Sequence, residues 1–207
     1  MKRAPNQAPA LWPAAVVLLA TLGAAAASAR GQGASPATSP SAAPALPRDD
    51  FAAGTRAASL YLGYDRTFVG DPQAGFAAVG LGYYFRDGMS LTAEARTYGF
   101  DQDAGSDAAL FELDLMFRHH VVRGDGWSLY LDLGAGVTQA TRAVPTGGTH
   151  FNFIEEAGAG ATLRLADGVH LFGGARYWHL SNARIDGVDK NPALNGVGAY
   201  VGVMWTF

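Results

Sequence analysis

The stretch ALFELDLMFRH, residues 109–119, alternates between apolar and polar side chains over almost its whole length. The apolar residues of this run are Phe111, Leu113, Leu115 and Phe117, and the residues between and after them are Glu112, Asp114, Met116 and Arg118. Side chains two positions apart lie on the same face of a β-strand, whereas a helix repeats every 3.6 residues. The stretch therefore predicts a strand with one apolar face and one charged face.

The same period of two recurs from Ala57 to the C-terminus, and no window carries a sustained helical stripe. We predict eight strands, at residues 57–65, 76–85, 89–98, 109–119, 127–137, 151–165, 169–182 and 197–207. The sequences RDG, RGDG and ADG predict tight hairpin turns after strands two, four and six, and the other connections are long and polar. Short turns at one end and long loops at the other are typical of a small outer-membrane barrel with its turns in the periplasm.

Alternation alone also fits a soluble sandwich or a lipocalin-like barrel. Three features favour a membrane-spanning barrel over these soluble folds. Charges fall on one face in strand after strand, where the filled interior of a barrel can pair them. The chain ends on Phe207 after alternating apolar residues, which is similar to the signal that outer-membrane assembly machinery reads. Aromatic residues gather at strand ends, as interfacial girdles do: Tyr83, Tyr84, Phe85, Phe117, Trp127, Tyr177, Trp178, Trp205 and Phe207. The predicted fold is all-β, an eight-stranded antiparallel transmembrane β-barrel of the outer membrane.

Two segments precede the predicted barrel. Residues 1–29 have the marks of a cleaved signal peptide: Lys2 and Arg3, an apolar stretch, and the small-x-small run that ends at Ala29. A membrane anchor is the alternative, but the stretch is short, rich in alanine and interrupted by Pro13. Residues 30–54 are rich in Pro, Ala and Ser without an apolar period, which predicts a flexible spacer. The barrel is expected over residues 55–207.

Composition narrows the function further. The chain has 207 residues, a formal net charge of -3 and no cysteine, which rules out a disulfide framework and the thiolate ligands of most zinc sites. There is no run of Lys or Arg, so nucleic acid is not expected as a partner. His119 and His120 are adjacent and face opposite sides of a strand, so they cannot chelate one ion together. We predict neither a metal nor a cofactor.

The run YWHLSNA, residues 177–183, carries the chemistry. If Arg176 points into the barrel with the other charges, His179 and Ser181 both face lipid, at the end opposite the ADG turn. One interpretation is structural: His179 is solvated by headgroups and Ser181 starts a loop. The other is a nucleophile with its general base, because serine needs a base and histidine titrates in the useful range.

The segments HLSNA (residues 179–183) and NPALN (residues 191–195), with a last strand ending in aromatic-x-Phe, resemble the lipid A 3-O-deacylase (PagL-type) family. That family's pattern is His-x-Ser-Asn-Ala and then Asn-Pro-Gly-x-(Glu or Asn). The resemblance implies hydrolysis of the ester-linked 3-hydroxyacyl chain at position 3 of lipid A, with Ser181 as nucleophile and His179 as base. Asn195 stands where the best-known members have Glu, and an amide orients the imidazole without stabilising imidazolium by charge.

The remaining site predictions are less direct. Asn191 is the preferred oxyanion donor, although an Asn-Pro pair can simply start a turn, and Asn182 contributes only if the strand ends before it. Glu155 is a possible auxiliary acid, placed roughly opposite Tyr177, ahead of Asp186 and Asp189 in the loop. The expected partners are lipopolysaccharide and outer-membrane lipids, and a homodimer is left open. The rival functions are a non-catalytic barrel with a structural or binding role, and a soluble secreted barrel with an apolar ligand.

Overall fold

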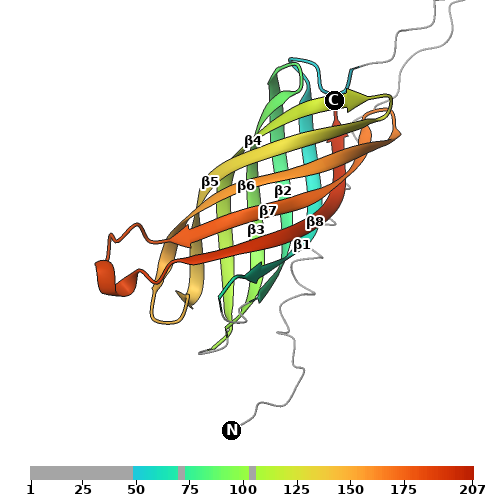
Figure 1. The fold of residues 1–207 in the computed structure, drawn as a ribbon. Helices are drawn as coiled ribbons and strands as arrows, with labels where there is room; N and C mark the ends of the chain where they lie inside the picture. Colours follow the sequence, from blue (N-terminus) through green and yellow to red (C-terminus); the bar gives the residue numbers. More distant parts are fainter. Residues whose placement is uncertain (1–48, 70–72, 103–105) are drawn as a thin grey trace, which may run out of the picture.

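The computed structural model describes residues 49–69, 73–102 and 106–207. These residues form a closed barrel of eight antiparallel strands in chain order, with β1 paired to β8 (Figure 1). The prediction of an eight-stranded barrel is confirmed. The strands are β1 (Arg56–Thr67), β2 (Gln73–Arg86), β3 (Met89–Asp101), β4 (Ala108–Gly124), β5 (Trp127–Val144), β6 (Thr149–Ala166), β7 (Val169–Ser181) and β8 (Leu194–Thr206), and a short 3-10 helix, η1 (Val188–Lys190), precedes β8.

The two ends of the barrel differ. At the turn end, at the top of Figure 1, tight turns join β2 to β3, β4 to β5 and β6 to β7. Gly88, Gly126 and Gly168 take φ values of +71°, +76° and +68° in these turns, where a residue with a Cβ would be strained. The other end, called the loop end here, carries the remaining connections. The predicted signal peptide and residues 30–48 of the spacer lie outside the described residues. The helical part of the described chain includes no segment with the length and apolar character of a membrane-spanning helix.

The connection between β5 and β6 is shorter than the sequence predicts. Residues 138–144 and 149–150, expected in a long loop, continue the two strands, so that β5 and β6 are each 18 residues long. Residues 145–148 alone form the turn between them. Thr138, Ala140 and Val144 are buried, whereas Arg142, which has the same parity, is exposed. Backbone pairing continues with a register shift, from Gln139 opposite Phe151 to Val144 opposite Thr149.

Charged residues fill the interior, as the alternation predicts. The guanidinium of Arg96 lies 2.9 Å from Glu94, 2.9 Å from Glu112, 2.5 Å from Asp114 and 2.5 Å from Glu156. A buried charge is tolerated when it is paired and hydrogen-bonded. The interior is thus a packed core in which paired charges lie among buried aromatic and aliphatic side chains such as Tyr61, Phe172 and Met204.

A second interior cluster lies next to the first. Arg118 and Arg176 both pair with Asp132, at 2.8 Å and 2.9 Å.

Two residues of the predicted aromatic girdle lie in the interior instead. Tyr84 and Trp178 have the inward parity and are buried, with 1% and 4% of their surface exposed. The other residues of the predicted girdle have the outward parity and are at least partly exposed.

The predicted spacer boundary at residue 54 is also wrong, because residues 49–54 pack against the turn end. The ring of Phe51 is buried and stacks on His120 with centroids 4.0 Å apart. Asp50 is buried and lies 3.2 Å from His170 and 3.3 Å from Arg164. The folded part of the chain therefore includes Asp49 to Gly54.

Candidate active site on the outer wall

His179 and Ser181 lie on the outward face of the last part of β7. The alternate residues Trp178 and Leu180 are buried in the barrel, and Arg176 is held there by its ion pairs. Ser181 is the last residue of β7, at the end opposite the β6–β7 turn. The pair therefore occupies the outer wall at the loop end, which is the position that the parity of the strand predicts.

The imidazole of His179 is oriented by the neighbouring strand. His179 and Asn195 are paired in the β7–β8 register, and Nδ1 of the imidazole lies 2.8 Å from Oδ1 of the Asn195 amide. An amide oxygen can only accept, so Nδ1 carries the proton and Nε2 has a free lone pair. This is the tautomer that a general base requires.

Ser181 stands two residues beyond His179 on the same face, about 6.6 Å along the strand. No hydrogen bond joins its hydroxyl to the imidazole within the described residues. Both side chains are half-buried. Because catalytic hydrogen bonds are often long before substrate binds, the arrangement offers a nucleophile and a base on one surface without the proton-transfer contact already made.

The two asparagines considered as oxyanion donors, Asn182 and Asn191, differ in which of their side-chain groups are already hydrogen-bonded. Asn182 is fully buried; its Nδ2 donates to the Lys190 carbonyl at 2.8 Å and its Oδ1 accepts from the Arg184 N–H at 2.9 Å. Oδ1 of Asn191 accepts the Asn182 N–H at 2.8 Å, and its Nδ2 has no hydrogen-bond partner in the described part of the chain. Asn182 thus stabilises the loop with both ends of its amide, whereas Asn191 still has a donor to offer.

Glu155 lies closer to the candidate site than the sequence predicts. The β6–β7 register pairs Glu155 with His179, and it is Ala157 that lies opposite Tyr177. The expected position opposite Tyr177 is therefore wrong by two residues. A bulge between Arg164 and Ala166 shifts the pairing by one residue, so that Glu155 meets His179 and not Leu180. The Glu155 side chain is exposed and makes neither a hydrogen bond nor an ion pair within the described ranges. It is a free carboxylate on the strand next to the imidazole.

Sequence reasoning missed the contact between Tyr177 and Asn195. The Tyr177 hydroxyl donates a 2.5 Å hydrogen bond to Oδ1 of Asn195, the same atom that His179 contacts. Tyr177 shares the outward face of β7 with His179, and diagonal neighbours in a sheet lie within reach of an aromatic side chain. That parity is the only sequence signal, and it does not identify the partner.

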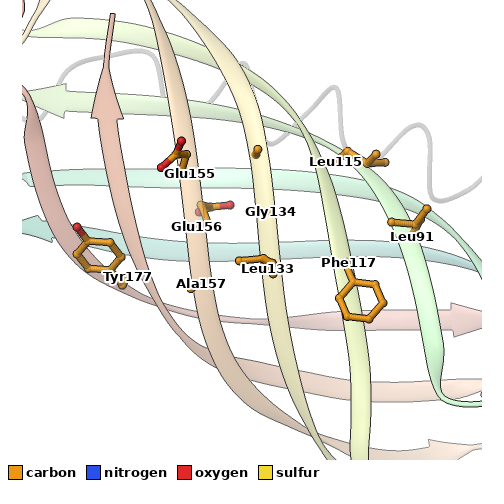
Figure 2. A pocket seen from close by; sticks show the side chains of 10 residues that line it. Leu91, Leu115, Phe117, Leu133, Gly134, Glu155, Glu156, Ala157 and Tyr177 are labelled. Atoms are coloured by element: carbon orange, nitrogen blue, oxygen red, sulfur yellow. The ribbon is translucent and has the colours of Figure 1, made fainter. Parts of the chain in front are cut away.

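An open groove of about 510 Å³ crosses the outer wall beside the site (Figure 2). It spans β3 to β7 and is lined by Leu91, Leu115, Phe117, Leu133, Gly134, Ala135, Glu155, Glu156, Ala157 and Tyr177. Figure 2 places Tyr177 and Glu155 on one side of the groove and Leu91 and Leu115 on the other. The small outward-facing side chains of Ala135 and Ala157, between larger neighbours, leave room for the depression. The surface fits an apolar chain that lies along the barrel.

Within the described residues, one carboxylate group has the spacing of a metal site. Ligand atoms of Glu112, Asp114 and Glu156 lie within 4.8 Å of one another. The guanidinium of Arg96 lies 2.5–2.9 Å from all three and supplies the positive charge there. The group is inside the barrel, on the other side of the wall from His179.

Comparison with known proteins identifies a family and similar folds. A family model described as lipid A 3-O-deacylase (PagL) matches residues 77–204. Neisserial surface protein A has a similar solved structure, with a TM-score of 0.57 at 14% identity over 74% of this chain and 96% of the other. The outer membrane enzyme PagL is similar with a TM-score of 0.54 at 17% identity, over 70% of this chain and 97% of the other. No curated protein sequence matches. At these identities the structures show the fold, and the family rests on the model match.

Proposed function

Because the chain belongs to the lipid A 3-O-deacylase (PagL) family, an outer-membrane family of hydrolases, we propose that it removes the 3-hydroxyacyl chain at position 3 of lipid A with Ser181 as nucleophile and His179 as general base. One observation carries this assignment. Nδ1 of His179 is bound to Asn195 on the outward-facing wall, which leaves Nε2 available to act as a base toward Ser181, two residues further along the same face. A lipid of the outer leaflet reaches this face sideways and has no need to enter the filled interior.

The proposed reaction has two halves. Nε2 of His179 takes the Ser181 proton as Oγ attacks the ester carbonyl, and the imidazolium then protonates the departing 3-oxygen of lipid A. A water molecule attacks the acyl-serine by the same route, which releases a 3-hydroxy fatty acid and restores Ser181. Asn191 is proposed to donate its free amide hydrogens to the tetrahedral oxyanion.

Asn195 leaves the imidazolium without a charged partner. Glu155, opposite His179 on β6, is the carboxylate that we propose as an auxiliary acid. Its charge would favour imidazolium through space, although exposure weakens the effect. The groove that begins at Glu155 and Tyr177 offers a place for the acyl chain.

Mass spectrometry of lipid A tests the proposal. Expression in a Gram-negative host should remove one 3-hydroxyacyl chain, and Ser181→Ala or His179→Ala should abolish the loss. Ser106→Ala, in an exposed loop, and His119→Ala, on β4, are matched controls that should keep full activity. Heat-modifiable migration in a detergent gel confirms that each variant folds.

The alternative is a non-catalytic barrel with a structural or binding role, for which the neutral Asn195 is the supporting observation. Unchanged lipid A with a folded wild-type barrel would favour that alternative. Full activity of a folded Ser181→Ala protein would rule out the proposed nucleophile.

A further inference from the structure

Tyr177 and His179 contact the same atom. Oδ1 of Asn195 accepts the Tyr177 hydroxyl at 2.5 Å and lies 2.8 Å from Nδ1 of His179. We propose that Tyr177 is a positioning residue, which holds the Asn195 amide with its oxygen toward the imidazole. The effect on catalysis rests on the proposed function, whereas the effect on the imidazole does not.

An amide needs such support and a carboxylate does not. The two ends of an Asn side chain have nearly the same shape, and one is an acceptor while the other is a donor. If the Asn195 amide rotates, its NH₂ group donates to Nδ1 and the imidazole proton moves to Nε2. In that tautomer Nε2 cannot take a proton from Ser181. In trypsin-like proteases the wrong tautomer that an Asp-to-Asn change produces costs about 10⁴-fold in kcat.

The Tyr177 hydroxyl favours the productive orientation of the amide. A phenol is a good donor, and its oxygen is a weaker acceptor than an amide carbonyl because one lone pair is delocalised into the ring. With Oδ1 facing both partners, Asn195 receives two hydrogen bonds. In the rotated form, the phenol would have to accept from Nδ2 instead, which is the less favourable exchange.

Phe68 holds the tyrosine and the asparagine together. Its ring stacks on the Tyr177 ring, with centroids 6.1 Å apart and planes 24° apart. Its backbone N–H donates to the Asn195 carbonyl at 2.9 Å. The residue just after β1 therefore restrains both members of the hydrogen bond, which lowers the conformational entropy that the bond must overcome.

Tyr177 also lines the groove, so the test must separate positioning from contact with substrate. Tyr177→Phe keeps the ring and removes only the hydroxyl. In Asn195→Asp, both oxygens are acceptors, so either one keeps the proton on Nδ1. The consequence of losing the Tyr177 hydroxyl should therefore depend on residue 195. A substrate contact would be lost equally in both backgrounds.

A kinetic cycle on the full-length protein in mixed micelles of detergent and purified lipopolysaccharide measures this dependence. Tyr177→Phe should lower kcat about tenfold with little change in KM, the ratio given by one neutral hydrogen bond. In the Asn195→Asp background the same change should cost less than about twofold. Tyr83→Phe, which removes an outward-facing hydroxyl on β2, is the control and should have no effect. An unchanged kcat in Tyr177→Phe, or an equal loss in both backgrounds, would overturn the proposal.

Ring-nitrogen NMR tests the inference without substrate. In the ¹⁵N spectrum of the micellar protein, the His179 signals, assigned by their loss in His179→Gln, should report the proton on Nδ1. In Tyr177→Phe they should shift toward a mixture of the two tautomers, and a spectrum that does not change would contradict the inference. If the wild-type protein released no acyl chain, the proposed function would be wrong, and this spectrum would still decide on Tyr177.

Discussion

Replacing Arg96 by Met should destabilise the barrel more than any other single loss of a luminal arginine. The guanidinium contacts Glu94, Glu112, Asp114 and Glu156 within 2.9 Å, and all four side chains are almost completely buried. Removing one partner of a buried ion pair typically costs about 3–5 kcal/mol, because the charge left behind is neither solvated nor paired. Glu94 and Glu156 would keep Arg176, at 3.0 Å and 3.8 Å, but Glu112 and Asp114 would both lose their cation, so the loss should lie at the upper end of that range.

Arg118→Met is the matched control. Its partner Asp132 would keep Arg176 at 2.9 Å and the Tyr200 hydroxyl at 3.0 Å. The cost should therefore be smaller than for Arg96. Urea unfolding of the barrel in lipid vesicles, followed by tryptophan fluorescence, gives both free energies of unfolding. Adding Asp114→Asn to Arg96→Met should restore part of the lost stability. Equal free energies for the Arg96 and Arg118 variants, or no effect of Asp114→Asn, would refute the assignment of Arg96 as the centre of the luminal charge network.

Two predictions concern the outer wall. Asn195→Glu should preserve or raise the rate of lipid A deacylation, because a carboxylate also accepts from Nδ1 of His179 and in addition stabilises imidazolium; complete loss of activity would remove Asn195 from the site. Ala157→Phe should raise KM severalfold by filling the groove beside Tyr177, while the free energy of unfolding changes little because the side chain faces lipid. An unchanged KM in micellar kinetics would place the acyl chain elsewhere.

The period of two was enough to predict the fold, because the two sides of each strand face different surroundings. Features that depend on contacts between strands are harder to predict from the sequence. Residues around Pro145 look like a long loop in the sequence, yet the strands before and after them continue to pair. Tyr84 and Trp178 match an aromatic girdle by composition and contradict it by parity. Phe51 follows a polar segment, and its partner His120 is far away in the sequence, so nothing local predicts its burial.

The candidate site also has parts that the sequence predicts and parts that depend on strand pairing. The outward direction of His179 and Ser181 follows from their spacing from Arg176, which the sequence contains. The contact of Tyr177 with Asn195 depends on the β7–β8 register, and a twelve-residue connection from Asn182 to Ala193 separates these strands. Loop length alone does not set a register of that kind. For the same reason the bulge near Arg164, which brings Glu155 opposite His179, had no signal in the sequence.

The interior charges and the outer site are linked through the register of β7. Arg176 pairs with Glu94 at 3.0 Å and with Asp132 at 2.9 Å, three residues before His179 on the opposite face. A slip of one residue would turn His179 and Ser181 into the barrel and carry Arg176 into lipid, where a lone charge costs several kcal/mol. The salt bridges of Arg176 therefore do more than fill the interior. They specify which face of β7 meets the membrane, and so they keep the histidine and the serine on the surface that a lipid substrate can reach.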